Sequence, residues 1–513
     1  MKTVDVGAVL DEGRWTGYQK LLIFGTALTI ILDGIDNQLL PNTIPALIAE
    51  WGGTRPDYVP ALAWGPFGMM IGGLVGGVLG DRLGRRTALL GSVLTFAALT
   101  FAIAHLPAGN IDMLGLLRFL AGVGLGGAMP NAATLASEYV PRKQRPFAVT
   151  MTIICIPLGG VVAAEMAALI LPGHEFVFSV FGIRLFAFTL EGWRDLFQVG
   201  GVLPLILAAI LWKVLPESPR YLAARKERWP ELTRVLRKMG HDVPDDAVYA
   251  DTRGSAAPTR SGNTIYYVLV VAGIMALWQL GFLAGPLVYG AVAGALILLA
   301  LAVREFSPAY RRDTAGLFGS FFFCLMVNYV IIQLLVVLLT GNGGFTVPQA
   351  NRALSISNVG GVVGALLGAL LIQRFGSRVT MLGMSAIAIG SALILAGRPL
   401  DPSDMVVFLI LVGITGALLN AVQTTMYALA TNIYPTEIRG TGVGTAVAVG
   451  RIGNVLAAFV GNYAIEVGKV PGYWLSIAIL MALVFVSLAI IQRHVSRTSK
   501  AAHGASVAVP ASH

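Results

Sequence analysis

Two acidic residues, Asp33 and Asp36, lie three positions apart in a long apolar segment near the N-terminus. Residues with this spacing share one face of a helix, and a carboxylate inside a membrane segment is costly enough to mark a functional site. Close, buried carboxyl groups can take up and release protons, so we interpret the pair as a proton-coupling site. A helix-breaking Asp-Gly unit beside an outer vestibule is the alternative. Glu165, in a later apolar segment, is a further proton-coupling candidate.

Two arginines lie inside apolar segments in the same way. Arg451 lies midway along the segment 441–465, where a guanidinium can bind a carboxylate through two parallel hydrogen bonds. We predict that it binds an anionic substrate; pairing with a buried acid such as Asp33 is the alternative. Arg118 is expected at the depth of Asp36, where it could contact substrate, form a salt bridge that protonation breaks, or snorkel to the interface. Four polar side chains, able to line a cavity or to bond a neighbouring helix, complete the predicted substrate site: Asn131, Asn328, Gln423 and Tyr427.

A short charged turn between two apolar segments recurs in the second half of the chain. The first copy reads Gly77-Val-Leu-Gly-Asp81-Arg82-Leu-Gly84-Arg85-Arg86, and the second, 292 residues later, reads Gln373-Arg374-Phe-Gly376-Ser-Arg378. Another signature, from Glu138 to Arg145, returns 294 residues later and ends at Arg439. Repetition of this kind is the layout of a two-halved secondary transporter. We predict that the charged residues and glycines of both signatures form a gating loop, although Arg85 and Arg86 could serve only as positive-inside anchors.

The composition supports this layout and excludes other classes. Of 513 residues, 56% are hydrophobic and 12% are charged, and the mean hydropathy is +0.75, as in a polytopic membrane protein. The net charge of +9 comes from basic residues in short loops, so we interpret it as a topology signal and expect no nucleic-acid partner. Nucleotide-binding, metalloprotease and hydrolase motifs are missing, and Cys155 and Cys324 lie alone in apolar runs. We expect no enzymatic activity, metal or cofactor, and a proton gradient as the energy source.

The apolar runs predict an all-α membrane protein with about fourteen transmembrane helices. Twelve form two six-helix bundles, near 21–40, 58–79, 87–106, 111–132, 147–171 and 196–215, and near 315–339, 353–372, 379–397, 405–431, 441–465 and 472–491. Two more, over 265–283 and 286–303, are expected to form an inserted hairpin that crosses the membrane or lies at its interface. The predicted division is a cytoplasmic segment (1–20), the first bundle (21–222), a cytoplasmic loop (223–264), the hairpin (265–303), a second loop (304–314), the second bundle (315–491) and a disordered cytoplasmic tail (492–513).

The loop charges predict the orientation. Arginines and lysines concentrate in alternate loops, which places both termini in the cytoplasm. The N-terminus has no cleavable signal, so we expect its first helix to remain in the mature protein. The aromatic segment 172–195 is expected to rest on the membrane or to act as a lid over the outer mouth.

Several of these strings resemble a known family. The turn around Asp81 resembles the loop signature of the major facilitator superfamily between its second and third helices. The strings Asp33-Gly-Ile-Asp36, Arg118-Phe-Leu-Ala-Gly-Val-Gly-Leu-Gly-Gly-Ala-Met-Pro130-Asn131 and Gly450-Arg451-Ile-Gly453 look like its aromatic acid:proton symporters, over most of residues 14–222 and 315–491. The resemblance implies a bacterial inner-membrane carrier of benzoate-, hydroxybenzoate- or phenylpropionate-type acids. It also implies coupling by Asp33 and Asp36, and carboxylate binding or coupling by Arg118 and Arg451. The regions 223–314 and 172–195, and Glu165, depart from the pattern.

The expected function is therefore proton-coupled import of a small organic anion, an aromatic carboxylate by the resemblance, by alternating access of a monomer in the lipid bilayer. The aromatic ring is expected to lie against Met129, Ile153 and Phe323. A drug or metabolite:proton antiporter ranks second, because its fifth-helix glycine signature survives only as Ile156-Pro157-Leu-Gly159-Gly160. A sugar carrier would need a glutamine-rich seventh-helix motif, which is missing here. A membrane sensor that does not transport its ligand would need a longer signalling tail.

Overall fold

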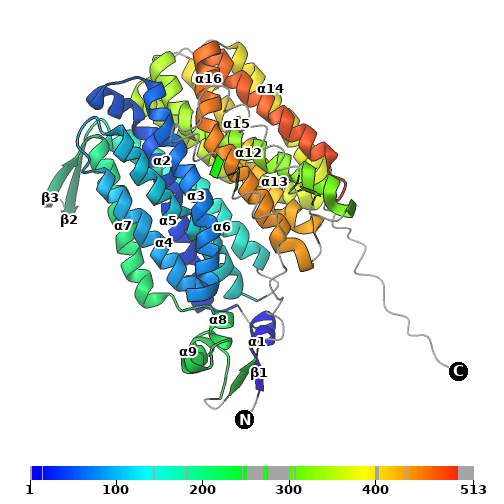
Figure 1. Ribbon diagram of the computed structural model, residues 1–513. Helices are drawn as coiled ribbons and strands as arrows, with labels where there is room; N and C mark the ends of the chain where they lie inside the picture. The colour runs from blue at the N-terminus through cyan, green and yellow to red at the C-terminus, as the bar shows by residue number, and fades with distance from the viewer. Residues whose placement is uncertain are drawn as a thin grey trace.

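The structure, a computed structural model, divides its long helices into two bundles that pack side by side (Figure 1). It describes residues 3–13, 15–141, 145–180, 183–244, 247–250, 308–398, 404–434 and 436–494, with a few isolated positions between 270 and 304. The first bundle contains α2 (Gly17–Trp51), α3 (Arg55–Leu83), α4 (Arg85–Ile103), α5 (Ile111–Glu138), α6 (Arg145–Ile170) and α7 (Gly192–Val214). The second contains α12 (Pro308–Asn342), α13 (Val347–Phe375), α14 (Ser377–Gly397), α15 (Met405–Ile433) and α16 (Thr436–Ile490).

In the described part of the chain, eleven helices are long and apolar enough to cross a membrane. One of them, α16, has 55 residues and breaks its helical geometry at Lys469 (φ 50°, ψ −135°), two residues before Pro471. A straight helix of that length would measure about 80 Å, against a hydrocarbon core of about 30 Å, so α16 supplies two crossings. The mostly helical, multi-pass fold agrees with the prediction. The predicted hairpin over 265–303 lies almost wholly outside the described residues.

The two bundles repeat the same local signals. A capping box begins α3, where Thr54 and Asp57 exchange hydrogen bonds, and another begins α13, where Thr346 and Gln349 do the same. Each box satisfies backbone N–H groups that the first helical turn leaves without partners. Thr346 follows Thr54 by 292 positions, which is the offset of the charged turns in the sequence.

Small residues let equivalent helices approach closely in both bundles. A Cβ atom at Gly68 or Gly72 of α3 would collide with the backbone of α5, and one at Gly360 or Gly364 of α13 would collide with the backbone of α15. Glycines four residues apart form a flat strip along a helix, so the backbones can touch and slide. These contacts hold α3 against α5 and α13 against α15, and all four of these helices contribute to the pocket described below.

Two small sheets show that the all-α prediction was wrong in detail. The strands β1 (Thr3–Asp5) and β4 (Val248–Ala250) pair in parallel. The strands β2 (His174–Val180) and β3 (Ile183–Leu190) form an antiparallel hairpin at the edge of the first bundle (Figure 1), within the predicted lid or membrane-resting loop. Short helices α1 (Val6–Glu12), α8 (Pro219–Ala223) and α9 (Trp229–Lys238) and the 3₁₀ turn η2 (Lys226–Arg228) lie beside β1 and β4 at one end of that bundle.

Candidate functional site

A pocket lies between the two bundles, near the middle of the long helices. Helices α2, α3, α5 and α6 line it from the first bundle, and α12, α13, α15 and α16 line it from the second. Four of the six predicted substrate residues reach it: Asn328, Gln423, Tyr427 and Arg451. Its other polar lining residues are Asp33, Asn37, Gln38, Tyr329, Asn358, Asn420 and Thr424, and its apolar lining residues are Met69, Met129, Ile153, Ile156, Pro157, Leu325 and Ile332.

Arg451 is the cationic residue of this lining. Its Nη1 contacts the Met69 sulfur at 3.7 Å, and its charge interacts with Asp33 and with the hydroxyl groups of Tyr329 and Tyr427. The thioether is a weak acceptor, and beside its contacts with Met69 and the Tyr329 hydroxyl the guanidinium has further N–H donors that a ligand could use. A carboxylate in the pocket would contact a guanidinium that lies beside Met69, Asp33, Tyr329 and Tyr427, which come from four different helices.

Asp33 lines the same pocket from α2. Its side chain is 6% exposed, and its Oδ1 atom has no hydrogen-bond partner. A buried carboxylate oxygen without a partner is costly when it is charged. The charged form of Asp33 therefore depends on a nearby cation for stabilisation.

Asp36 has a different environment, although it lies on the same helix face. Its Oδ2 accepts a hydrogen bond from Arg118 Nη1 at 3.1 Å, and its Oδ1 accepts one from Thr100 Oγ1. Arg118 is only 3% exposed, Asp36 is fully buried, and neither lines the pocket. The structure thus brings Asp36 and Arg118 together as an ion pair within the first bundle, and it places Arg118 away from the predicted substrate site.

Polar side chains join the bundles over the pocket. Asn37 Nδ2 donates to the Tyr329 hydroxyl at 3.0 Å, and these two residues are 292 positions apart, so equivalent positions of the repeat meet at the interface. Next to them, Gln38 and Asn358 exchange two amide hydrogen bonds, of 3.2 and 2.9 Å. Both bonds link α2 to the second bundle, so any ligand in the pocket lies against the contact between the halves.

More hydrogen bonds join the two bundles between the pocket and the end of the molecule where α2 ends at Trp51. Gln333 Nε2 donates to the Leu62 carbonyl at 3.1 Å, and Arg55 Nε donates to Asn462 Oδ1 at 2.8 Å. Asn462 in turn donates to Glu466 at 2.8 Å. We call these five residues the closed seam. The hydrogen bonds named here between the bundles lie at the pocket and along this seam.

Besides Asp36 and Arg118, three predicted residues lie outside the pocket: Glu165, Asn131 and Phe323. Glu165 is exposed on α6, away from the pair Asp33 and Asp36. Asn131 is fully buried and donates to the carbonyls of Gly76 (2.9 Å) and Gly127 (2.8 Å), so it joins α3 to α5. Of the three apolar residues expected around the ring, Met129 and Ile153 line the pocket and Phe323 does not.

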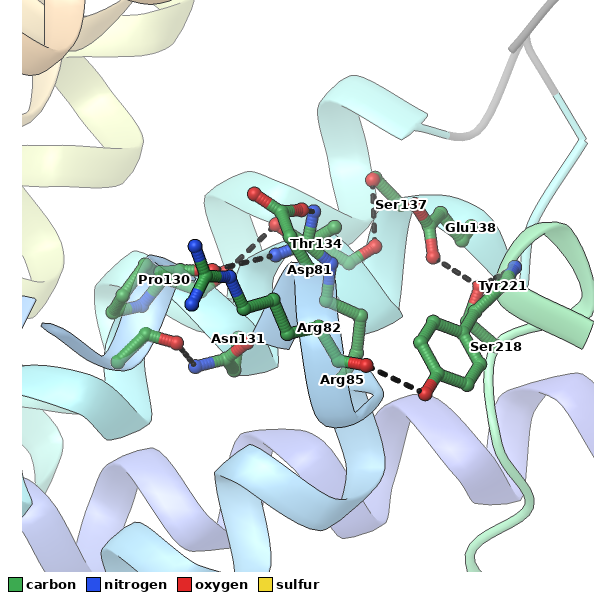
Figure 2. Close-up of polar contacts among 12 residues, drawn as sticks. Asp81, Arg82, Arg85, Pro130, Asn131, Thr134, Ser137, Glu138, Ser218 and Tyr221 are labelled. Carbon is green, nitrogen blue, oxygen red and sulfur yellow. Dashed lines mark hydrogen bonds and ion pairs between the residues drawn. The ribbon is translucent and has the colours of Figure 1, made fainter. Parts of the chain in front are cut away.

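The charged turn, drawn in Figure 2, lies at the end of α3 opposite to Arg55 of the closed seam. Gly84 has a φ of 107° between α3 and α4, a conformation that favours glycine. Arg85 pairs with Asp81, and its Nη1 lies 3.5 Å from the Gly77 carbonyl. The Arg82 carbonyl accepts from the Tyr221 hydroxyl at 3.1 Å, as Figure 2 shows. The turn is therefore tied to α8 as well as to its own helices.

Glu138 and Arg86 extend this network within the same bundle. Glu138 accepts a hydrogen bond from Ser218, and the Arg86 backbone N–H donates to Glu217 at 2.9 Å. Tyr139, just beyond α5, donates to the Pro216 carbonyl at 2.5 Å. Burial raises the pKa of Tyr139 well above its usual range, so the phenol stays neutral and keeps its proton in that bond.

The second copy of the turn has the same kind of glycine conformation. Gly376 has a φ of 82° between α13 and α14, and the Arg374 guanidinium lies 5.5 Å from the centre of the Phe375 ring. Arg378 is exposed in the first turn of α14. The remaining two predicted gating residues, Arg145 and Arg439, lie in the first turns of α6 and α16, and their side chains are outside the described part.

The predicted site residues did not include six polar residues of the pocket: Asn37, Gln38, Tyr329, Asn358, Asn420 and Thr424. A signal for two of them was present, because Asn37 and Gln38 directly follow Asp36 in an apolar segment. Asn358 follows two serines in α13, which is also unusual for a membrane span. Tyr329 carried no comparable signal.

Two protein families match the chain. The family described as Sugar (and other) transporter matches residues 62–280, and the Major Facilitator Superfamily matches residues 317–512. Among solved structures, the xylose transporter XylE from E. coli in a partially occluded inward open conformation has a TM-score of 0.63 at 17% identity. That match covers 92% of this chain and 97% of the other, and at this identity it shows the fold alone.

Curated relatives match over most of their length. The gallate transporter of Pseudomonas putida is 29% identical over 91% of this chain and 90% of its own. The 4-hydroxybenzoate transporter PcaK of the same organism is 29% identical over 91% of each chain. The 3-(3-hydroxy-phenyl)propionate transporter of Escherichia coli is 29% identical over 80% of each. The second half of the chain thus matches the Major Facilitator Superfamily, and over most of its length the chain is similar to aromatic acid transporters; like them it is a transporter and not an enzyme.

Proposed function

We propose that the protein imports an aromatic carboxylate together with protons across the bacterial inner membrane, with both termini in the cytoplasm. The observation that carries the proposal is Arg451, a guanidinium in a pocket between the two bundles with apolar walls. A guanidinium selects a carboxylate, and side chains such as Met129 and Ile153 suit an aromatic ring. The relatives that transport gallate, 4-hydroxybenzoate and 3-(3-hydroxy-phenyl)propionate support the same class of substrate.

Proton coupling would operate through Asp33. Without substrate, its negative charge partly balances Arg451. A substrate carboxylate on Arg451 takes over that balance, and the buried Asp33 then gains by taking up a proton. Substrate and proton therefore load together and carry little net charge through the membrane. The pair of Asp36 and Arg118 would stabilise the helix that presents Asp33, or would open as a second coupling site.

Alternating access would be controlled from the two ends of the bundles. The closed seam would block the periplasmic side, while the opposite end, which carries the Asp81–Arg85 turn, would be open to the cytoplasm. Transport then requires the seam to separate while the turn-bearing ends approach each other. Such a rocking motion can leave the glycine contacts of α3 with α5 and of α13 with α15 intact, since these lie within each bundle.

Several finer features belong to the same proposal. The first bundle would extend over 21–222 and the second over 315–491, with the hairpin 265–303 between them and a monomer as the functional unit. Glu165 takes no part in the proposed mechanism, because it is exposed on α6. The gating residues of both turns would act as latches on the cytoplasmic side.

Uptake into proteoliposomes tests the proposal. Purified protein would be given labelled 4-hydroxybenzoate with and without an inwardly directed proton gradient, and with a protonophore. We expect accumulation that needs the gradient and collapses with the protonophore. Absence of accumulation would contradict the proposal, and dyes driven against the proton flow would identify a proton antiporter instead.

A further inference from the structure

We propose that the Gln38–Asn358 amide pair is a specificity determinant that recognises a hydroxyl group on the ring of the substrate. The inference rests on the proposed function and narrows it from aromatic carboxylates in general to hydroxylated ones. Neither residue carries charge, and neither is needed to hold the carboxylate. Both line the pocket that contains Arg451.

The two recognition elements lie on different sides of the same pocket. Arg451 adjoins the Tyr329 hydroxyl, and Tyr329 accepts a hydrogen bond from Asn37. Gln38 is the next residue of α2, so its side chain is rotated by about 100° around the helix from that of Asn37. The amide pair therefore borders the pocket on a different side from the guanidinium. A ring whose carboxylate binds Arg451 can direct a substituent toward the amides.

The pair retains unused hydrogen-bonding capacity. Each amide group has two N–H donors and two carbonyl lone pairs. The reciprocal bonds of 3.2 and 2.9 Å use one donor and one lone pair of each side chain. One donor and one lone pair per side chain remain, and a hydroxyl group needs both kinds of partner. A phenolic hydroxyl can therefore bind without breaking the contact between the bundles.

The surroundings fix the amides in place. Gln38 is 2% exposed and Asn358 is 4% exposed. A Cβ atom at Gly160 of α6 would lie 2.8 Å from Asn358 Nδ2 and would collide with the Gln38 amide as well. Because glycine at this position lets the α6 backbone approach, both amide planes are held against it. Buried, fixed polar groups reject a ligand that cannot satisfy them.

Methyl analogues provide a sharp test, because a methyl group has nearly the shape of a hydroxyl group but forms no hydrogen bond. Uptake KM values would be measured in proteoliposomes for 3- and 4-hydroxybenzoate and for 3- and 4-methylbenzoate. We expect at least one hydroxy acid to have a KM about tenfold below that of its methyl analogue. The double variant Gln38→Met with Asn358→Leu removes both amides at similar volume, and we expect it to bring that ratio close to one.

Gln333→Met is the matched control. Gln333 is also a buried amide that bridges the bundles, but it does not line the pocket, so the ratio should persist in this variant. Equal KM values for hydroxy and methyl acids in the wild type, or a ratio that survives in the double variant, would overturn the inference. In the first case transport of aromatic acids still stands, whereas failure of all four acids to accumulate would remove the proposed function itself.

Discussion

Arg451 and Asp33 reach one pocket from opposite bundles, which links substrate binding to the contact between the halves. Their charges interact, but Asp33 keeps an oxygen without a hydrogen-bond partner. Asp36 differs because Arg118 and Thr100 satisfy both of its oxygens. Two acids that look equivalent in the sequence therefore have different hydrogen-bond environments.

We expect Arg451→Lys to raise the KM for an aromatic acid roughly tenfold or more. An ammonium group is a point charge and cannot form the planar, two-bond contact of a guanidinium with a carboxylate. The matched control is Arg398→Lys, at an exposed position where Arg398 pairs with Asp404. Initial uptake rates over a range of substrate concentrations would decide the matter. An unchanged KM in Arg451→Lys would contradict the assignment of this residue to substrate binding.

Asp33→Asn should separate substrate movement from proton movement. The amide cannot exchange a proton, so the variant is expected to equilibrate substrate across the membrane without concentrating it. Asp112→Asn, at an exposed acid in the first turn of α5, serves as the control and should concentrate substrate normally. The measurement compares steady-state accumulation with counterflow exchange. Normal accumulation by Asp33→Asn would show that the proton is carried elsewhere.

The sequence was sufficient to single out Asp33, Asp36, Arg118 and Arg451, because charged side chains are rare in membrane spans. It named the Asp36–Arg118 and Asp33–Arg451 pairs only as alternatives to substrate contact, and it could not decide which pairing forms. That pairing depends on the rotation of α2, α5 and α16 about their axes, which is set by packing between helices distant in sequence. The Gln38–Asn358 pair was unpredictable for the same reason, since it joins residues 320 positions apart.

At the scale of elements, the glycine turns between paired helices control how the helix ends meet. Gly84 has a φ of 107° and Gly376 has a φ of 82°, so both bundles use the same backbone conformation at equivalent positions. Around Gly84, the side chain of Glu217 also approaches closely. A side chain at this position would meet both backbone strain and a steric clash.

We expect Gly84→Ala to lower the stability of the folded protein by about 1–3 kcal/mol. Gly91→Ala is the control, because Gly91 lies inside α4 with open space around it, and alanine there should be neutral or slightly stabilising. Thermal unfolding of both variants in detergent provides the comparison. Equal midpoints for the two variants would mean that the turn tolerates a side chain.

Element prediction succeeded for the long helices and failed for the short strands. Uninterrupted apolar runs separated by Gly, Pro and charged residues indicated the helices directly. The segments β2 and β3 were predicted as an aromatic loop that rests on the membrane or acts as a lid, because the apolar run is too short for a membrane helix. Pairing of β1 with β4 could not be inferred, since three-residue strands carry little signal and their register depends on distant contacts.

At the scale of the whole molecule, the repeat offset of 292 residues accounts for much of the architecture. It relates the charged turns, the capping boxes and the glycine strips, and it also relates Asn37 to Tyr329, which meet directly. Duplication therefore predicted two similar bundles. Duplication did not predict which ends of the bundles are in contact. The same sequence can adopt conformations in which either end is closed, so the sequence alone does not determine the answer.

Breaking the closed seam should favour the opposite conformation. Arg55→Ala removes the donor to Asn462. Leu62 is 4% exposed in the seam, so a cysteine introduced there by Leu62→Cys can report its opening. We expect this cysteine to react several-fold faster with an impermeant thiol reagent from the periplasmic side when Arg55→Ala is also present. Both native cysteines, Cys155 and Cys324, would be replaced by serine in all variants so that the reagent labels the introduced cysteine alone. Arg352→Ala, at an exposed residue of α13, is the control and should leave the labelling rate unchanged. Slow labelling despite Arg55→Ala would show that other contacts hold the seam.

The pairing of β1 with β4 has a consequence for synthesis of the protein. Thr3–Asp5 cannot find their partner strand until the ribosome has made Val248–Ala250, after all six helices of the first bundle. Until then the apolar side chains of Val6 and Leu10, fully buried in the finished protein, lack part of the surface that covers them. The N-terminus thus becomes fixed only when the first half is complete, and a nascent chain that stalls earlier carries an exposed apolar segment that quality-control factors can recognise.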